Sequence, residues 1–384
     1  MKCWNSQLYK KKSHASDIDR ETLKNVIKVG DSVTSKYSCL PIFTFSHLCK
    51  QSSSDPKKLD KAVMRRNIKE DISNYRTFNI SKNSKPFKTR EISIPCPELL
   101  NIQKFIHEHI LLSIPSHPSV FSYKKGSKIY EAAEIHCDSE WLIKVDIKDF
   151  FDSINEIHVY RVFRSIGYPA LLSFQMARLC TKAKAKAGLN LNKQVNTSKK
   201  YALEKYNNKM KGVLPQGAPT SPILSNLIGF KMDEALQQIA DDNEFIYSRY
   251  ADDICFSSPD KALDREFCLL IVKKIYKVIN NQGFEPNDKK LRIVPPGARK
   301  VILGLIVNGP KPHLSKSFKK NLLTHLHFCN RSDVGPALHS QQKKFASIIG
   351  FRNHLKGLVS YAKQIDSNFG AKVLKEYEKI IWPI

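Results

Sequence analysis

The stretch FIYSRYADDICFSS, residues 245–258, decides the fold of this chain. Apolar residues alternate on both sides of Tyr250-Ala251-Asp252-Asp253, which predicts two strands joined by a tight turn. Two adjacent carboxylates at the tip of such a hairpin repel each other. A divalent cation that prefers oxygen ligands, such as Mg²⁺, would remove that repulsion. The pair Asp241-Asp242 shows that two adjacent aspartates alone are weak evidence, because it lies in a polar helix-to-strand junction and is expected to be solvated.

A third carboxylate, Asp146, ends the apolar strand pattern WLIKVDI (141–147). For Asp146 taken alone, a helix cap after a strand would be the better interpretation. Three carboxylates at strand ends are, however, what two-metal phosphoryl transfer needs, because two cations activate the attacking hydroxyl and stabilise the leaving pyrophosphate. The sequence therefore predicts that Asp146 joins Asp252 and Asp253 in one metal site.

The charge of the chain indicates its partner. With 63 Lys and Arg against 36 Asp and Glu over 384 residues, the formal net charge is +27. A solvated basic surface and a membrane-binding surface are alternatives, but the basic residues are spread along the chain and no isolated amphipathic helix carries them. No apolar run is long enough to span a bilayer. Phosphates of a nucleic acid are the expected counter-charge. Nine scattered cysteines and the lack of an apolar leader pattern predict a cytoplasmic protein with reduced thiols.

The remaining elements follow from periodicity and turn residues. Residues 1–60 are polar and predict an extension with a few short helices. Residues 182–211 hold nine lysines against one acid and predict a basic insertion or a solvated loop. Further predictions are a hairpin from about Tyr75, a helix from Pro97, helices at 157–180 and 262–282, a strand pair in KVILGLIVNG (300–309), and helices from about Lys311 onward.

Five motifs in this order resemble those of reverse transcriptases. VDIKDFF, LPQGAPTSPILSN and YADD are similar to the first three palm motifs, and the second of them is highly specific. The other two are FNISKNSKPFKTREISIPCPELLNIQKFI (78–106), which resembles the fingers motif, and GFEPNDKKLRI (283–293), which resembles the fourth palm motif. The resemblance covers about Tyr75 to the C-terminus. It implies an α+β right-hand polymerase with fingers, a palm built on an antiparallel sheet, and a helical thumb.

The resemblance also implies the ligands of the metal site. Asp146 and Asp252 would bridge two Mg²⁺ ions, for which Mn²⁺ is a substitute, and Asp253 would be an outer ligand. The backbone carbonyl of Ile147 would be a further ligand. Lys290 would lie near the leaving pyrophosphate, with Lys289 as the alternative, although Leu291 stands where the family usually has threonine.

The same resemblance assigns the nucleotide pocket. Phe151 would lie beneath the incoming sugar, where a bulky ring rejects a 2′-hydroxyl; a core aromatic is the alternative, which suits Phe150 better. Arg90, with Lys85 and Lys88, would reach the triphosphate, although these residues could equally be loop charges facing solvent. The pocket would be lined by Gln216, Gly217 and Tyr250.

Within this family the chain most resembles the retron type. Ala132-Ala133 and His136 stand where retron enzymes carry Asn-Ala-x-x-His, and the C-terminal residues 354–380 resemble the retron thumb. RNA-binding residues would be His136, Lys356, Tyr361 and Lys363, with an ordinary lysine-coated bundle as the alternative. The implied partners are dNTPs, a cognate structured non-coding RNA that is both template and primer, the branched RNA–DNA product and an effector protein in anti-phage defence, with oligomerisation around RNA and DNA and no membrane.

Three other interpretations stay open. One is a defence-associated or group II intron-like reverse transcriptase with different priming. A second is a reverse-transcriptase fold that serves as an RNA–DNA scaffold restraining an effector, and a third is a generic basic RNA-binding protein. The predicted domains are an N-terminal extension (1–60), fingers (61–140 and 156–212), palm (141–155 and 213–310) and thumb (311–384).

Overall fold

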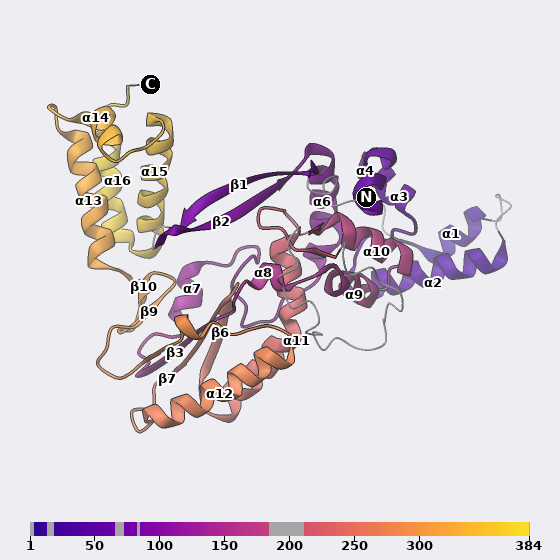
Figure 1. The fold of residues 1–384 in the computed structure, drawn as a ribbon, viewed down its shortest axis with the longest axis horizontal. Coiled ribbons are helices and arrows are strands. Elements are labelled where there is room, and N and C mark those ends of the chain that lie inside the picture. The colour runs from indigo at the N-terminus through magenta and orange to yellow at the C-terminus, as the bar shows by residue number, and fades with distance from the viewer. Residues whose placement is uncertain (1–3, 14–18, 66–72, 83–84, 184–210, 384) are drawn as a thin grey trace.

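The computed structural model describes residues 4–13, 19–65, 73–82, 85–183 and 211–383, without the side chains of residues 82 and 85–88. The predicted α+β class is confirmed. A four-stranded sheet lies between helices, a long hairpin extends beside it, and a bundle of helices ends the chain (Figure 1). None of the described helices combines the length and apolar character that a bilayer crossing requires.

The central sheet is antiparallel with the strand order β6-β7-β3-β8. Its strands are β6 (Ile246–Tyr250), β7 (Asp253–Ser258), β3 (Trp141–Asp146) and β8 (Arg292–Val294). The predicted strand, tight turn and strand are therefore confirmed, as is the strand that leads into Asp146. Because β3 lies between β7 and β8, segments more than 100 residues apart in the sequence meet at one end of the sheet.

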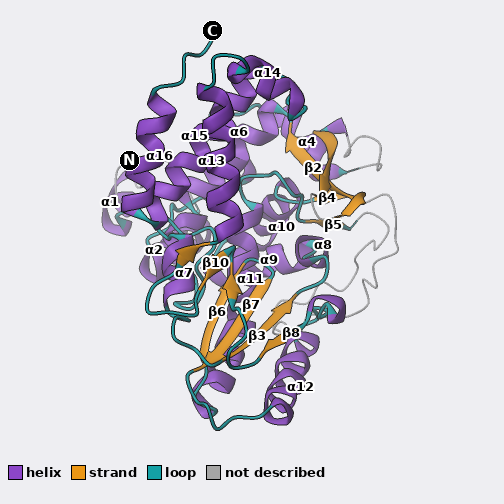
Figure 2. Cartoon of the chain, turned by 90° about the vertical axis from the view of Figure 1, so that its left-hand side faces the viewer, coloured by secondary structure: helices purple, strands orange, loops and turns teal. Residues whose placement is uncertain are grey.

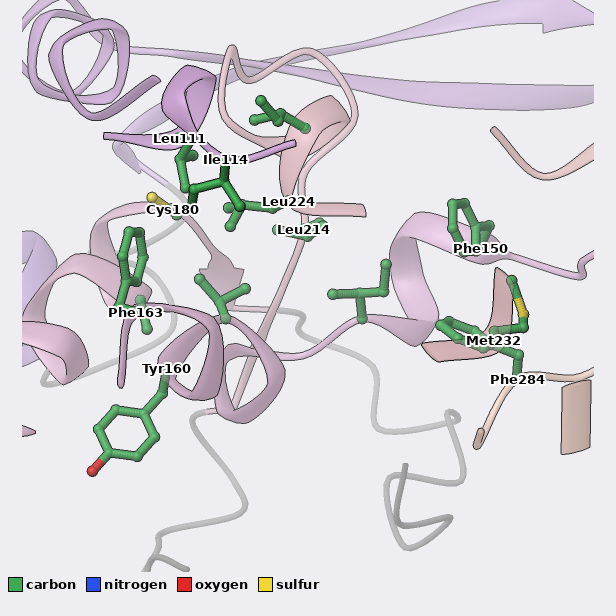
Figure 3. Close-up of a cluster of buried hydrophobic side chains, with 14 of the residues drawn as sticks. Leu111, Ile114, Phe150, Tyr160, Phe163, Cys180, Leu214, Leu224, Met232 and Phe284 are labelled. Atoms are coloured by element: carbon green, nitrogen blue, oxygen red, sulfur yellow. The ribbon is translucent and has the colours of Figure 1, made fainter. Parts of the chain in front are cut away.

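The two faces of this sheet belong to different apolar cores. Ile143 and Ile254 contribute to the larger core, which also contains residues of α11 (Ser221–Asp242) and α12 (Arg265–Asn281). Figure 3 shows part of that core, where Phe150, Met232 and Phe284 gather near one another. Leu142 and Cys255 point the other way, into a second core shared with the C-terminal helices. Side chains alternate along a strand, so Asp146 and Asp253 share the face of Leu142 and Cys255.

The predicted hairpin consists of β1 (Tyr75–Lys82) and β2 (Lys85–Pro95), and α6 (Pro97–His109) follows it with proline in its first turn. In Figure 1 the hairpin projects as a two-stranded ribbon from the α6 end. Its base is joined to the loop of residues 214–219, the LPQGAP loop, because the Ser93 amide donates to the Gln216 carbonyl at 2.7 Å. The hairpin and the glycine-containing loop are thus connected through their backbones.

The helical segment predicted at 157–180 is confirmed, but it consists of two helices. The structure has α9 (Glu156–Ile166) and α10 (Ala170–Leu179), separated by Gly167, Tyr168 and Pro169. Gly167 has a φ of 121°, which favours glycine, and Pro169 precedes the first residue of α10. Gly167 and Pro169 therefore end the first helix at Ile166, although the helical spacing of apolar residues continues beyond it.

The C-terminal part contains a small sheet before its helices. Strands β9 (Val301–Ile302) and β10 (Leu305–Ile306) form the predicted pair, and Leu303 and Gly304 both have positive φ, as a two-residue hairpin turn requires. Strand β11 (His313–Leu314) lies in the stretch predicted to be helical, because it pairs with β10. The helices that follow are α13 (Lys316–Asn330), α14 (Gly335–Gln342), α15 (Ile348–Ile365) and α16 (Ser367–Glu378), which pack side by side (Figure 2).

The remaining elements surround this framework. The N-terminal stretch holds α1 (Ser6–Ser13), α2 (Arg20–Tyr37), α3 (Phe45–Gln51) and α4 (Pro56–Met64). Of the predicted basic insertion, residues 184–210 lie outside the described part, and its ends pair as β4 (Lys182–Ala183) and β5 (Gly212–Val213). The short helical segments are η1 (Leu111–Ser113), α7 (Ile129–Glu134), α8 (Phe150–Ser153) and η4 (Asp288–Lys290).

Candidate active site

Three carboxylates meet at one end of the central sheet. Asp146 is the last residue of β3 and is directly opposite Asp253, the first residue of β7. Asp252 lies in the two-residue turn between β6 and β7, and its carbonyl accepts the Ile147 amide at 3.0 Å. Like charges on directly opposed residues destabilise a sheet, so this arrangement needs a compensating positive charge.

The protonation equilibria reflect this crowding. Burial, together with Asp253 and Asp146, raises the pKa of Asp252 to about 6. Burial also raises the pKa of Asp253; Asp146 adds to that increase, and Lys144 opposes it. Burial and the neighbouring carboxylates both disfavour the ionised forms of Asp252 and Asp253. A bound divalent cation would reverse the effect, because metal ligation requires the ionised forms.

Lys290 supplies one positive charge at this site. Its Nζ lies 2.5 Å from Asp146 Oδ2, while Asn287 donates from its side-chain amide to Asp146 Oδ1 at 2.8 Å. Burial lowers the pKa of Lys290, but the hydrogen bond to Asp146 and the three carboxylates raise it overall, so the ammonium stays protonated. The structure thus brings Lys290 to Asp146, and it adds Asn287, which sequence reasoning did not single out. Lys289 is exposed, with no described contact to the carboxylates.

The donor chemistry fits Mg²⁺. Within the described residues no three acidic, histidine or cysteine side chains already surround a cation position. Both carboxylate oxygens of Asp146 instead accept hydrogen bonds from Lys290 and Asn287. Asp252 and Asp253 are half-buried carboxylates with raised pKa values, and hard oxygen donors of this kind are the ligands that Mg²⁺ prefers.

The turn that carries Asp252 is held by a buried polar network. Arg249 and Asp233 form a bidentate ion pair at 2.6 and 2.7 Å, and both side chains are fully buried. Arg249 also donates to the Ala251 carbonyl at 3.0 Å, and the Ala251 amide donates to the Ser122 hydroxyl at 2.8 Å. Ala251 has a φ of 55°, a conformation that costs a non-glycine residue about 1–2 kcal/mol. The two hydrogen bonds therefore fix a strained turn from both sides.

An aromatic group lies beside this turn. Phe151 is half-buried, and its ring lies edge-to-face with Phe150 at 5.9 Å and with Tyr123 at 6.3 Å. Tyr123 also lies 6.5 Å from the half-buried ring of Tyr250. Phe150 is 3% exposed and contacts Phe284, which confirms its expected place in the core. Sequence reasoning missed Tyr123, whose loop has no regular pattern.

The LPQGAP loop approaches the hairpin closely. Gly217 has a φ of 115°, and a Cβ at this position would lie 2.9 Å from the Ser93 carbonyl oxygen and 3.0 Å from Ile92. A glycine is therefore required for the close approach of this loop to the hairpin backbone. Gln216 is half-buried beside it, and Arg90 is exposed on β2. Lys85 and Lys88 lie on the same strand, with their side chains outside the described part.

The four predicted RNA-binding residues divide into two groups. Lys356 and Lys363 are exposed on α15, and Tyr361 on the same helix is half-buried against Phe318. His136 is fully buried, and both of its ring nitrogens form hydrogen bonds with serine hydroxyls, those of Ser248 and Ser257. The prediction that His136 contacts RNA is therefore wrong, because this side chain connects α7's end to the central sheet.

Comparison with known proteins places this site in a family. A family model described as reverse transcriptase (RNA-dependent DNA polymerase) matches residues 80–320. The retron Ec86 reverse transcriptase of Escherichia coli is 26% identical over 307 residues, which are 79% of this chain and 84% of the relative. The retron Mx162 reverse transcriptase of Myxococcus xanthus is also 26% identical, over 76% of this chain and 58% of the relative.

A structural comparison gives a weaker likeness. The structure of telomerase from Candida albicans in complex with a fragment of telomeric RNA aligns with 83% of this chain and 60% of that chain, at 12% identity and a TM-score of 0.38. The family model covers well over half of the chain and includes all three aspartates and Lys290. The chain belongs to the reverse transcriptase family of RNA-dependent DNA polymerases, and the relatives that it resembles include several retron reverse transcriptases.

Proposed function

We propose that this chain copies a cognate structured non-coding RNA into single-stranded DNA that remains joined to the RNA, the branched product called msDNA. One observation supports the proposed DNA synthesis: Asp146 and Asp253 are register partners at one end of the sheet, with Asp252 in the adjoining turn. The retron type is supported by the retron relatives. The net charge of +27 fits an RNA partner, because nucleic-acid affinity rests largely on phosphate neutralisation.

In this proposal the carboxylates hold two Mg²⁺ ions, or Mn²⁺ in their place. Asp146 and Asp252 would be the main ligands of the ions, with Asp253 as a weaker or outer ligand and the Ile147 backbone carbonyl as a further ligand. When bound, the ions supply charge neutralisation at the attacking hydroxyl and at the leaving pyrophosphate. Lys290, held as an ammonium beside Asp146, donates a proton or a hydrogen bond to the pyrophosphate. The raised pKa of Asp252 supports metal binding by the carboxylates, because a cation stabilises the ionised forms most where carboxylates are crowded together.

The nucleotide site lies between the hairpin and the sheet. Arg90, Lys85 and Lys88 on β2 bind the triphosphate, since a guanidinium gives bidentate phosphate contacts. Phe151 excludes a 2′-hydroxyl and so selects deoxynucleotides. Gln216, Gly217 and Tyr250 line the pocket; the bond from Ser93 to the Gln216 carbonyl couples this loop to the hairpin.

We further propose the right-hand division of the chain. Fingers are formed by residues 61–140 and 156–212, the palm by 141–155 and 213–310, and the thumb by 311–384. The exposed Lys356 and Lys363, with Tyr361 between them on α15, contact the structured RNA through its backbone and shape. In the proposed assembly this chain also binds an effector protein of anti-phage defence and oligomerises around the RNA and DNA. The assembly is proposed to form in the cytoplasm.

Sequencing the nucleic acid that co-purifies with the chain tests this proposal, before and after debranching and RNase treatment. The expected result is one short DNA joined 2′–5′ to one structured RNA. Linear or heterogeneous DNA would favour a group II intron-like or other defence-associated reverse transcriptase. RNA alone, with no DNA synthesis from added dNTPs, would favour a scaffold that restrains an effector.

A further inference from the structure

The loop of residues 119–127 lies along the outer edge of the central sheet and ends beside the carboxylates. The Arg249 amide donates to the Ser119 carbonyl at 2.9 Å, and the Phe121 amide donates to the Arg249 carbonyl at 3.0 Å, so the loop pairs in parallel with β6. Ser122 is fully buried and accepts the Ala251 amide. The next residue, Tyr123, is consequently held at the edge of the catalytic turn.

The backbone of Tyr123 is unusual for an aromatic residue. Its φ is 57°, in the left-handed region, and its side chain is 41% exposed. Asn226 donates to the Ser122 carbonyl at 2.8 Å, and the Ser127 hydroxyl donates to the Phe121 carbonyl at 2.5 Å, so the loop is closed on both sides of Tyr123. A strained, half-exposed aromatic that its surroundings hold in place indicates a functional constraint.

The ring of Tyr123 completes an aromatic wall. Phe151 lies edge-to-face with both Phe150 and Tyr123, at centroid distances of 5.9 and 6.3 Å. Phe150 is fixed in the core by Phe284 and by the guanidinium of Arg249, 5.7 Å from its ring centre. Tyr123 is the exposed partner, and it lies close enough to Asp252 and Arg90 for both charges to influence its hydroxyl. Its edge-to-face contact with the ring of Phe151 is therefore a restraint on that side chain.

We infer that Tyr123 is a specificity-determining residue, which positions Phe151 by ring contact so that Phe151 excludes the 2′-hydroxyl of a ribonucleotide. The inference rests on the proposed function, because it assumes that Phe151 lies beneath the incoming sugar. Without the ring of Tyr123, Phe151 can rotate toward the vacated space and leave room for a hydroxyl group. The effect acts on ribonucleotides alone, since a deoxynucleotide does not need that room.

The test is the ratio of kcat/KM for dNTP to kcat/KM for rNTP, measured for wild type, Tyr123→Ala, Tyr123→Leu, Tyr123→Phe and Phe151→Ala. Tyr123→Ala and Tyr123→Leu are expected to lower the ratio about tenfold through better use of rNTP, the scale of one edge-to-face ring contact. Tyr123→Phe keeps the ring and should retain the wild-type ratio. Leu270→Ala, which removes a 52% exposed side chain from α12, is the matched control and should also retain it.

Two outcomes would overturn the inference while leaving the polymerase intact. In the first, Phe151→Ala lowers the ratio and the Tyr123 variants do not. In the second, the Tyr123 variants lose dNTP and rNTP use in parallel, which indicates only structural support. A wild-type chain that makes no DNA on any RNA template would instead remove the proposed function itself.

Discussion

Replacing Arg249 by methionine tests whether the buried network beneath the YADD turn positions the carboxylates. Arg249 gives Asp233 two of its three hydrogen bonds, and the third comes from the Tyr247 hydroxyl at 2.6 Å. The variant leaves Asp233 as a fully buried charge without its cation. Loss of one partner of a buried ion pair costs about 3–5 kcal/mol, so we expect the free energy of unfolding to fall by that amount.

The double variant Arg249→Met/Asp233→Leu separates stability from positioning. Replacing both charges by apolar side chains removes the unpaired carboxylate, and most of the lost stability should return. The Ala251 carbonyl still lacks its donor, and one such hydrogen bond is worth about 1 kcal/mol. We therefore expect DNA synthesis to remain roughly fivefold below wild type, because the strained turn populates other conformations.

The assays are urea unfolding and dNTP incorporation on an RNA template. Arg331→Met is the matched control, because it removes one partner of an exposed pair with Asp333, and such pairs contribute about 0–1 kcal/mol. A double variant that recovers both stability and full activity would refute the positioning role. A single variant as stable as wild type would refute the buried ion pair itself.

Three further predictions follow from the site and the core. Gly217→Ala should raise the KM for dNTP, because the new Cβ would lie 2.9 Å from the Ser93 carbonyl oxygen. The control Gly309→Ala should leave the KM unchanged, because its Cβ would meet no described atom within 4 Å. Equal KM values for the two variants would contradict a close approach of Gly217 to the hairpin. In single-nucleotide incorporation, Lys290→Met should lower kcat about a hundredfold with little change in the KM for dNTP. A kcat within about twofold of wild type would contradict the proposed role of Lys290 at the leaving pyrophosphate. Burial lowers the pKa of His136 and of His158 to about 3, so the folded state keeps both rings neutral while the unfolded state protonates below about 6.5. The contribution of the two neutral rings to stability is therefore complete above pH 6.5 and is lost as the pH falls toward 3. The unfolding free energies of wild type and His136→Gln should converge by roughly 1.4 kcal/mol per pH unit below 6.5. Parallel curves of unfolding free energy against pH would contradict the lowered pKa of His136.

The strands and the identity of the carboxylates could be predicted because their signals are local. Alternating apolar residues around the Asp-Asp pair define β6 and β7, and an apolar run defines β3 up to Asp146. The opposition of Asp146 and Asp253 could not be predicted, because pairing register depends on tertiary packing. The break between α9 and α10 had a local signal, Gly167 followed by Pro169, which the apolar periodicity obscured.

The residues that support the site were harder to find, for physical reasons. Arg249 stands inside an apolar strand, and a buried arginine requires a buried acid, but the sequence does not say that Asp233 on α11 is that acid. His136 was assigned to RNA from a motif, whereas it lies between Ser248 and Ser257 on two strands brought together by the fold. Tyr123 carries no signal, since its position depends on a left-handed backbone in a turn.

The central claim is that the carboxylates of Asp146, Asp252 and Asp253 catalyse RNA-templated DNA synthesis. Its most direct test is Mg²⁺-dependent incorporation of dNTPs on an RNA template by wild type and by Asp252→Asn and Asp253→Asn, with RNA binding measured in parallel. We predict DNA from the wild-type chain and none from either variant, with RNA binding retained because the lysine-rich surface is unchanged. Continued Mg²⁺-dependent synthesis by both variants would contradict the claim.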